Sequence, residues 1–126
     1  MEVFAVRFGG RGQVAAQGWQ VLAGDLPLPL AVLRQDALAH NIAWMERFAR
    51  ERGCAMAPHG KTTMSPQLFR RQLEAGAWGL TFATVQQLAV GVQQAGVRRA
   101  LIANQVCTDA DLAGLAALLA RHPELR

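Results

Sequence analysis

The fold follows from two matching stretches, Glu74-Ala-Gly-Ala-Trp-Gly-Leu-Thr-Phe-Ala-Thr84 and Gln94-Ala-Gly-Val-Arg-Arg-Ala-Leu-Ile-Ala-Asn104. Each begins with an Ala-Gly pair suited to the end of a helix, continues into a short apolar run and closes on a polar residue. A third apolar run, Cys54–Ala57, leads into Pro58-His-Gly-Lys-Thr62. Short apolar strands that alternate with amphipathic helices indicate βα units and a parallel sheet, so the expected fold class is α/β.

Helices are expected between these strands because each gap opens on a capping residue. Asp36 is the expected N-cap of the first helix, and Gly53 is its expected stop. Later helices are expected to start at Ser65-Pro66, at Thr84 with the capping-box form Thr-x-x-Gln, and at Thr108. The apolar face of the first helix comprises Leu38, Ile42, Met45 and Ala49.

The chain before residue 26 carries weaker signals. Met1–Phe8 has the apolar content of a strand, whereas the rest of residues 1–25 predicts no element. An apolar run with two prolines then leads into Leu30–Leu33, which we expect to be a buried strand. We therefore divide the chain into an N-terminal segment, residues 1–25, and an α/β domain, residues 26–126. Its other strands are expected at Trp78–Ala83 and Ala100–Ala103.

Composition narrows the class of protein. The chain has 126 residues, of which 52% are hydrophobic and 17% charged, as is typical of a globular domain. Of its 13 basic residues only Lys61 is a lysine, which leaves 12 arginines behind the net charge of +4. The arginines are scattered over expected helix surfaces without interleaved aromatic residues. We therefore expect no nucleic-acid partner.

The cysteines and the hydropathy pattern indicate a cytoplasmic protein. Cys54 and Cys107 have no metal-ligand spacing and adjoin apolar segments, so we expect two buried free thiols in a reducing compartment. No segment reaches the 18 or so apolar residues of a membrane span. The N-terminus also lacks the pattern of a signal peptide, so we expect an unprocessed chain with no membrane contact.

Polar residues follow each expected strand: His59 and Lys61, then Thr84, then Asn104 and Gln105. The carboxyl ends of parallel strands form the functional face of such folds, so these side chains should converge. If the strand persists, His59 and Lys61 face the same side, and a partly desolvated amine there favours its neutral, nucleophilic form. Such an amine can form a Schiff base with a carbonyl group. The alternatives are a surface Lys61, a purely capping Thr84 and an Asn104 that only satisfies backbone groups.

Four segments also resemble one enzyme family, in the same order and spacing. They are Leu28–Leu33 before a helix with His40-Asn41, then Ala57–Thr62, then Gln72–Thr84, and finally Leu101–Val106. Leu26–Val106 thereby resembles the N-terminal part of pyridoxal-phosphate (PLP) enzymes of the alanine-racemase fold type, fold-type III. It is most similar to the D-threonine aldolase, D-serine dehydratase and amino-acid deaminase group. Thr63–Gln67 and Trp78-Gly79 resemble the deaminase branch more than the aldolases.

The resemblance implies a (β/α)8 TIM barrel with a separate C-terminal β-domain, and this chain would contain about the first three βα units. Lys61 would be the catalytic lysine that holds PLP as a Schiff base, and once displaced it would move a proton at the substrate Cα. His59 would lie beside the cofactor, and Thr84, Asn104 and Gln105 would contact cofactor or substrate. The implied reaction is deamination, dehydration or aldol cleavage of a D- or 3-hydroxy amino acid by a full-length homodimer.

The chain is short for this family, since a complete (β/α)8 barrel takes about 250 residues. The late phosphate-binding loops, the partner of the pyridine nitrogen and the divalent-metal ligands of some members lie outside it, and it has no Tyr. We therefore expect an N-terminal fragment that binds PLP poorly and is inactive alone. Two alternatives remain open: a non-catalytic PLP-binding homeostasis protein of the same fold, and a small α/β binding module without a cofactor. The small module would unfold cooperatively in denaturant.

Overall fold

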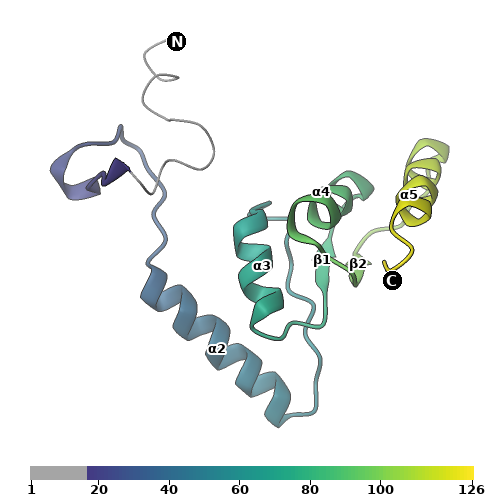
Figure 1. Ribbon diagram of the computed structural model, residues 1–126, viewed down its shortest axis with the longest axis horizontal. Helices are drawn as coiled ribbons and strands as arrows, with labels where there is room; N and C mark the ends of the chain where they lie inside the picture. Colours follow the sequence, from purple (N-terminus) through teal and green to yellow (C-terminus); the bar gives the residue numbers. More distant parts are fainter. Residues whose placement is uncertain (1–16) are drawn as a thin grey trace. The chain divides into compact units, whose positions relative to one another are not determined.

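The computed structural model describes residues 17–126 (Figure 1). The chain forms two compact units, Met1–Arg34 and Gln35–Arg126. The strand expected at Met1–Phe8 lies outside the described residues. The described part of the first unit contains a short 3-10 helix, η2, at Val21–Ala23, which ends at Gly24 in the left-handed conformation.

No strand forms at Leu30–Leu33, so this prediction was wrong. Leu30, Val32 and Leu33 are exposed by 37, 59 and 67%. A short strand is stable only when its backbone groups pair with a neighbour. Among residues 17–126, no segment pairs with this one.

The second unit opens with helix α2, Gln35–Glu51. The helix begins two residues nearer the N-terminus than an N-cap at Asp36 predicts, so Asp36 lies inside its first turn. Its carboxylate still interacts favourably with the helix dipole there. The predicted stop is confirmed, because Gly53 adopts a φ of 64° just beyond the last turn. The apolar face is only partly covered: Ala49 is buried, whereas Met45 is 39% exposed.

The rest of the unit alternates helices and strands, as the sequence predicted. The strands β1 and β2 pair in parallel, with Leu80 opposite Ala100, and both are shorter than expected. Helix α4 contacts both strands and both neighbouring helices (Figure 1). These elements are α3 (Pro66–Glu74), β1 (Leu80–Phe82), α4 (Val85–Ala95), β2 (Ala100–Ile102) and α5 (Asp109–Arg121).

The three predicted N-caps of these helices are confirmed. Ser65, Thr84 and Thr108 each accept a hydrogen bond from the backbone N–H three residues on, at 3.4, 3.2 and 3.1 Å. The capping box at α4 takes a variant form. The Gln87 side-chain oxygen accepts from the N–H of Ala83, at 2.9 Å, and not from that of the N-cap residue.

The core lies where α3, α4 and α5 cover the two strands. Its largest fully buried side chains are Phe69, Phe82, Leu80, Leu118 and Val97. Phe69 and Phe82 pack edge to face with their ring centroids 5.5 Å apart. Each such side chain contributes roughly 1.5–3 kcal/mol of burial free energy. This core fixes the two strands and therefore the edge at which they end.

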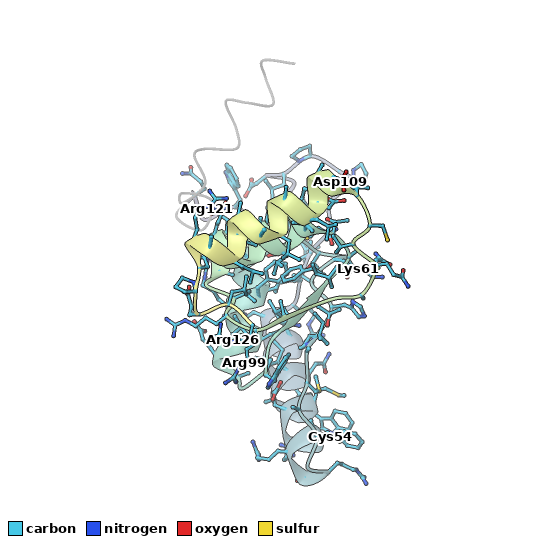
Figure 2. All side chains as sticks on the ribbon, turned by 90° about the vertical axis from the view of Figure 1, so that its right-hand side faces the viewer. Cys54, Lys61, Arg99, Asp109, Arg121 and Arg126 are labelled. Atoms are coloured by element: carbon cyan, nitrogen blue, oxygen red, sulfur yellow. The ribbon has the colours of Figure 1, made fainter. Side chains whose placement is uncertain are left out.

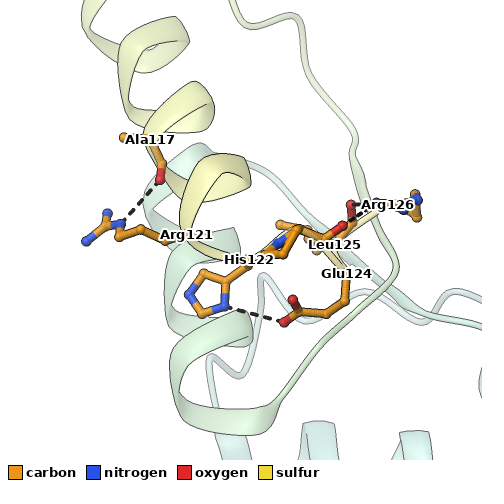
Figure 3. Close-up of polar contacts among 7 residues, drawn as sticks. Ala117, Arg121, His122, Glu124, Leu125 and Arg126 are labelled. Carbon is orange, nitrogen blue, oxygen red and sulfur yellow. Dashed lines mark hydrogen bonds and ion pairs between the residues drawn. The ribbon is translucent and has the colours of Figure 1, made fainter.

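The end of the chain adds one more parallel contact to the sheet. The Arg126 N–H donates to the Arg98 carbonyl, and the Arg126 carbonyl accepts from the Ala100 N–H, both at 2.9 Å. This is the pattern of a parallel pairing, on the edge of β2 that faces away from β1. Figure 3 shows the turn after α5 that leads there, where His122 Nδ1 lies 3.5 Å from Glu124 Oε1.

Candidate functional site

The segment around His59 lies beside β1 and extends the sheet by one short parallel contact. His59 pairs with Thr81. The Thr81 N–H donates to the Pro58 carbonyl, and the Gly60 N–H donates to the Thr81 carbonyl, both at 2.8 Å. The strand expected at Cys54–Ala57 is not formed. Pro58 explains this difference, because it has no N–H and the ladder cannot continue back through it.

The register brings the carboxyl ends of three parallel segments to one edge of the sheet. His59 lies opposite Thr81, and Thr81 lies opposite Leu101. The residues that follow these three positions therefore leave the sheet at the same level. This edge is the one at which the sequence placed the candidate site.

Three of the five predicted site residues line one cavity at this edge. Thr84, Asn104 and Gln105 border a cavity of about 280 Å³, together with Gln86 and Asp111. His59 and Lys61 are not among its lining residues. The structure thus brings the residues after β1 and β2 together, and it places the two residues of the first segment outside their cavity.

Two of these three residues already have roles in the fold. Thr84 caps α4, and the Asn104 side-chain amide donates to the Ala83 carbonyl at 2.8 Å. The Asn104 contact joins the end of β2 to the end of β1. These are the structural roles that the sequence left open as alternatives, and they also hold both side chains at the cavity. Gln105 is exposed.

Lys61 lies in a turn and not in a strand. The strand-like segment ends at Gly60, and the Met64 N–H donates to the Gly60 carbonyl at 3.0 Å, closing a turn over residues 61–63. Because the strand alternation stops at Gly60, the condition under which His59 and Lys61 would face one side is not met. The Lys61 side chain is exposed, which matches the alternative of a surface lysine that the sequence left open.

The amine of Lys61 is accessible at this position. Lys61 makes no hydrogen bond or ion pair with another described residue. In Figure 2, Lys61 lies on the same side of the unit as Asp109, at the start of α5, while Arg99 and Arg126 lie on the other side. The amine is therefore exposed on the side where the strands end and is open to an incoming ligand.

Two residues that shape this turn gave no signal in the sequence. Gly60 is buried, and a Cβ there would lie 2.8 Å from atoms of both the Phe69 and the Phe82 rings. Among the described residues, Thr81 is the one polar residue that is buried. Its hydroxyl donates to the Ala57 carbonyl at 2.7 Å. A glycine in a loop and a threonine in a strand are ordinary residues, so only their tertiary contacts identify them.

The cysteines do not follow the prediction of buried thiols. Cys54 and Cys107 are both exposed and free. The first comes directly after the end of α2 and the second lies in the loop before α5, so neither enters the core. Across residues 17–126, no three His, Cys, Asp or Glu side chains lie together as metal ligands would. No helix in that range is long and apolar enough to span a membrane.

Comparison with known proteins identifies relatives of this arrangement. No family model matches the chain. Over 62 residues, 49% of the chain, it is 36% identical to the D-threo-3-hydroxyaspartate dehydratase of Delftia sp. (strain HT23), of which that stretch is 16%. The structure is similar to the D-threonine aldolase of Filomicrobium marinum, with a TM-score of 0.72 and 31% identity over 76% of this chain and 26% of that one.

A single-residue variant of a D-threo-3-hydroxyaspartate dehydratase gives a TM-score of 0.69 and 31% identity, over 76% of this chain and 24% of that chain. The matched stretches therefore span between 16 and 26% of the length of these relatives. Over most of its length it is thus related to part of a D-threonine aldolase and of a hydroxyaspartate dehydratase, as the resemblance in its sequence predicted.

Proposed function

We propose that this chain is the lysine-bearing part of a PLP-dependent enzyme that acts on D- or 3-hydroxy amino acids. One observation carries the proposal: the chain's single lysine follows the His59–Thr81 pairing at the carboxyl edge of a parallel sheet. In parallel α/β folds the functional site lies at this edge. The relatives support the substrate class, since they are named for reactions of threonine and of hydroxyaspartate.

The residues present fit the aldehyde end of PLP. The Lys61 amine is exposed and has no partner among the described residues. Its condensation with an aldehyde, which releases water, therefore breaks no contact with the protein. Thr84, Asn104 and Gln105 offer hydroxyl and amide groups in a cavity at the same edge. Arg99 and Arg126 lie on the opposite side in Figure 2, so we assign the phosphate group to neither of them.

The chemistry divides between the cofactor and this chain. Bound PLP would supply an electron sink for negative charge that develops at the substrate Cα. Lys61 would hold the cofactor through its amine and, once released, would move a proton at that carbon. His59 would contact the cofactor beside Lys61. Thr84, Asn104 and Gln105 would orient the substrate through hydrogen bonds.

We further propose that the βα units are the beginning of a (β/α)8 barrel and that the chain alone is inactive. The contact of Arg126 with Arg98 and Ala100 supports this, because it lies on the edge of β2 that faces away from β1, where the next parallel strand of a barrel belongs. Leu101 of β2 is 51% exposed, which leaves apolar surface for further structure to cover. The homodimer and the cytoplasmic location remain predictions.

A PLP titration tests the proposal with a matched control. The control is Lys61→Arg combined with Arg47→Lys, which moves the lysine to an exposed site on α2 and keeps composition and charge. One net hydrogen bond to the cofactor is worth about 0.5–1.5 kcal/mol, so imine absorbance should show roughly two- to tenfold tighter binding by the wild-type chain. Equal affinities would refute the role of Lys61.

An activity assay tests the second part of the proposal. With PLP added, the isolated chain should not turn over D-threonine or D-threo-3-hydroxyaspartate, because most of a barrel is missing from it. Sustained turnover by the purified chain would contradict the claim that it is inactive alone, and it would leave the assignment of Lys61 intact.

A further inference from the structure

We propose that Thr81 is a positioning residue that holds the segment from Ala57 to Gly60 against β1 and thereby fixes the backbone from which Lys61 extends. The inference rests on the proposed function, since it gives Thr81 a role in presenting the cofactor lysine. Thr81 does not line the cavity and makes no hydrogen bond with Lys61, so it would act through the backbone that precedes that lysine.

Three hydrogen bonds attach Thr81 to this segment. Its hydroxyl donates to the Ala57 carbonyl at 2.7 Å, and its N–H donates to the Pro58 carbonyl at 2.8 Å. Its own carbonyl accepts from the Gly60 N–H at 2.8 Å. Thr81 is only 5% exposed, so these bonds are largely protected from competing water. One residue thus binds three of the four residues immediately before Lys61.

The hydroxyl bond has a specific cause in the sequence. A regular parallel ladder would continue backward from the His59–Thr81 pair through an N–H donor at position 58, and proline has none. The Thr81 hydroxyl supplies a side-chain bond to Ala57 just ahead of this gap. The next backbone bond of the segment is that of the Trp78 N–H with the Met56 carbonyl, at 2.8 Å.

The restraint reaches Lys61 through Gly60. The Gly60 N–H bonds to Thr81, and the Gly60 carbonyl accepts from the N–H of Met64 at the far side of the lysine turn. The Gly60 Cα also packs closely against the Phe69 and Phe82 rings. Because Gly60 is held on both sides, loosening of its attachment to β1 changes where the turn begins and therefore where the lysine backbone lies.

Thr81→Val tests the hydroxyl, since valine keeps the branched shape and removes the donor. We expect amide exchange at Gly60 to become about two- to tenfold faster in this variant, the equivalent of one net hydrogen bond. Thr81→Ser keeps the hydroxyl and should remain near the wild-type rate. Thr81→Cys, with a weakly donating thiol, should fall between them and gives a second comparison if the valine variant does not fold.

Val97→Ala is the control for a general loss of stability. Val97 is 1% exposed in the same core and makes none of these bonds, so its truncation should destabilise the fold without selectively speeding exchange at Gly60. If amide exchange at Gly60 is accelerated, relative to other amides, as much in Val97→Ala as in Thr81→Val, the positioning role is overturned. Unchanged Gly60 exchange in Thr81→Val would overturn it as well.

Labelling of Lys61 connects the exchange data to the proposed function. The chain is incubated with PLP and the imine is reduced with borohydride. Peptide mapping then measures the fraction of Lys61 that carries the reduced cofactor. Thr81→Val should lower its formation two- to tenfold, and Thr81→Ser should restore it. Wild-type labelling no better than that of the relocated lysine would refute the proposed function, while the exchange data would still test the anchoring. If the wild-type chain is labelled better than the relocated-lysine control, and Thr81→Val is labelled as well as the wild type, only the positioning role of Thr81 is refuted.

Discussion

Two glycines in neighbouring helices should respond in opposite ways to the same substitution. Gly91 lies in α4, and a Cβ there would overlap the Phe82 ring, 2.9 Å from Cε2 and 3.2 Å from Cε1, with Cζ closer still. Gly114 lies in α5, where a Cβ would meet only a Val85 methyl group at 3.7 Å, an ordinary contact. Both positions are helical, so replacement by alanine changes backbone propensity by a similar amount in each.

The magnitudes follow from these contacts. Alanine is favoured over glycine inside a helix by about 0.5–1 kcal/mol, so Gly114→Ala should stabilise the protein by that amount. At Gly91 the same gain is opposed by overpacking, which costs typically about 1–3 kcal/mol. The Phe82 ring cannot move away easily, because it is fully buried and packs edge to face against Phe69. Gly91→Ala should therefore destabilise the protein by about 1–2 kcal/mol.

The assay is urea unfolding of both variants and the wild-type chain, followed by far-ultraviolet circular dichroism. The buried cluster around Phe69 and Phe82 gives even a fragment of a barrel a core whose unfolding can be followed. The midpoints should move in opposite directions with unchanged slopes, and the two variants should differ by about 1.5–3 kcal/mol. Stabilisation by Gly91→Ala equal to that by Gly114→Ala would show that the close approach of α4 to the Phe82 ring does not exist.

Three further predictions follow from local contacts. Gly60→Ala should cost about 1–3 kcal/mol in the same urea experiment, because its methyl group would lie 2.8 Å from two buried phenylalanine rings, and neutrality would contradict this packing. Thr108→Ala should cost about 1 kcal/mol through loss of the α5 N-cap and Thr108→Gly only a few tenths, so equal losses would argue against a capping role. The pKa of Glu124 should lie below its ordinary value, because its own backbone N–H bonds the carboxylate and His122 and Arg98 add to the effect. Its contribution to stability is then present above the unfolded-state pKa and lost as pH falls through the lowered folded-state pKa, and an NMR titration at the ordinary value would disprove it.

The helices could be predicted because their signals are local. Ser65, Thr84 and Thr108 each cap a helix with their own side chain, and Gly96 ends α4 in the left-handed conformation, with a φ of 69°. Such residues act on backbone groups three or four positions away, so the sequence alone is sufficient. The one misplaced helix start, predicted from an N-cap at Asp36, differs by two residues.

The strands were predicted less well because a strand depends on a partner. Leu30–Leu33 has the composition of a buried strand and no partner among the described residues, so it stays exposed. Cys54–Ala57 has a neighbour, but the missing N–H of Pro58 interrupts the ladder and leaves one bridge at His59. Apolar composition thus indicated where strands could form, and hydrogen-bonding partners decided which of them did.

At the candidate site, too, the features set by local sequence could be predicted and those set by tertiary contacts could not. The position of Lys61 after a parallel segment was predicted from the order of apolar runs. Its exposure was left open by the sequence, because it depends on where the chain leaves the sheet. That point is Gly60, where two buried phenylalanine rings leave room only for glycine. The role of Thr81 depends on contacts across the sheet, which no local pattern in the sequence reveals.

The equilibrium between PLP and Lys61 tests the central claim most directly. The dissociation constant of the PLP imine is measured for the wild-type chain and for the variant that carries Lys61→Arg and Arg47→Lys. If Lys61 is the cofactor lysine, the wild-type chain binds PLP roughly two- to tenfold more tightly, since neighbouring groups add at least one hydrogen bond to the bound cofactor. Identical constants for the two proteins would mean that Lys61 behaves as any exposed lysine does and is not the cofactor lysine.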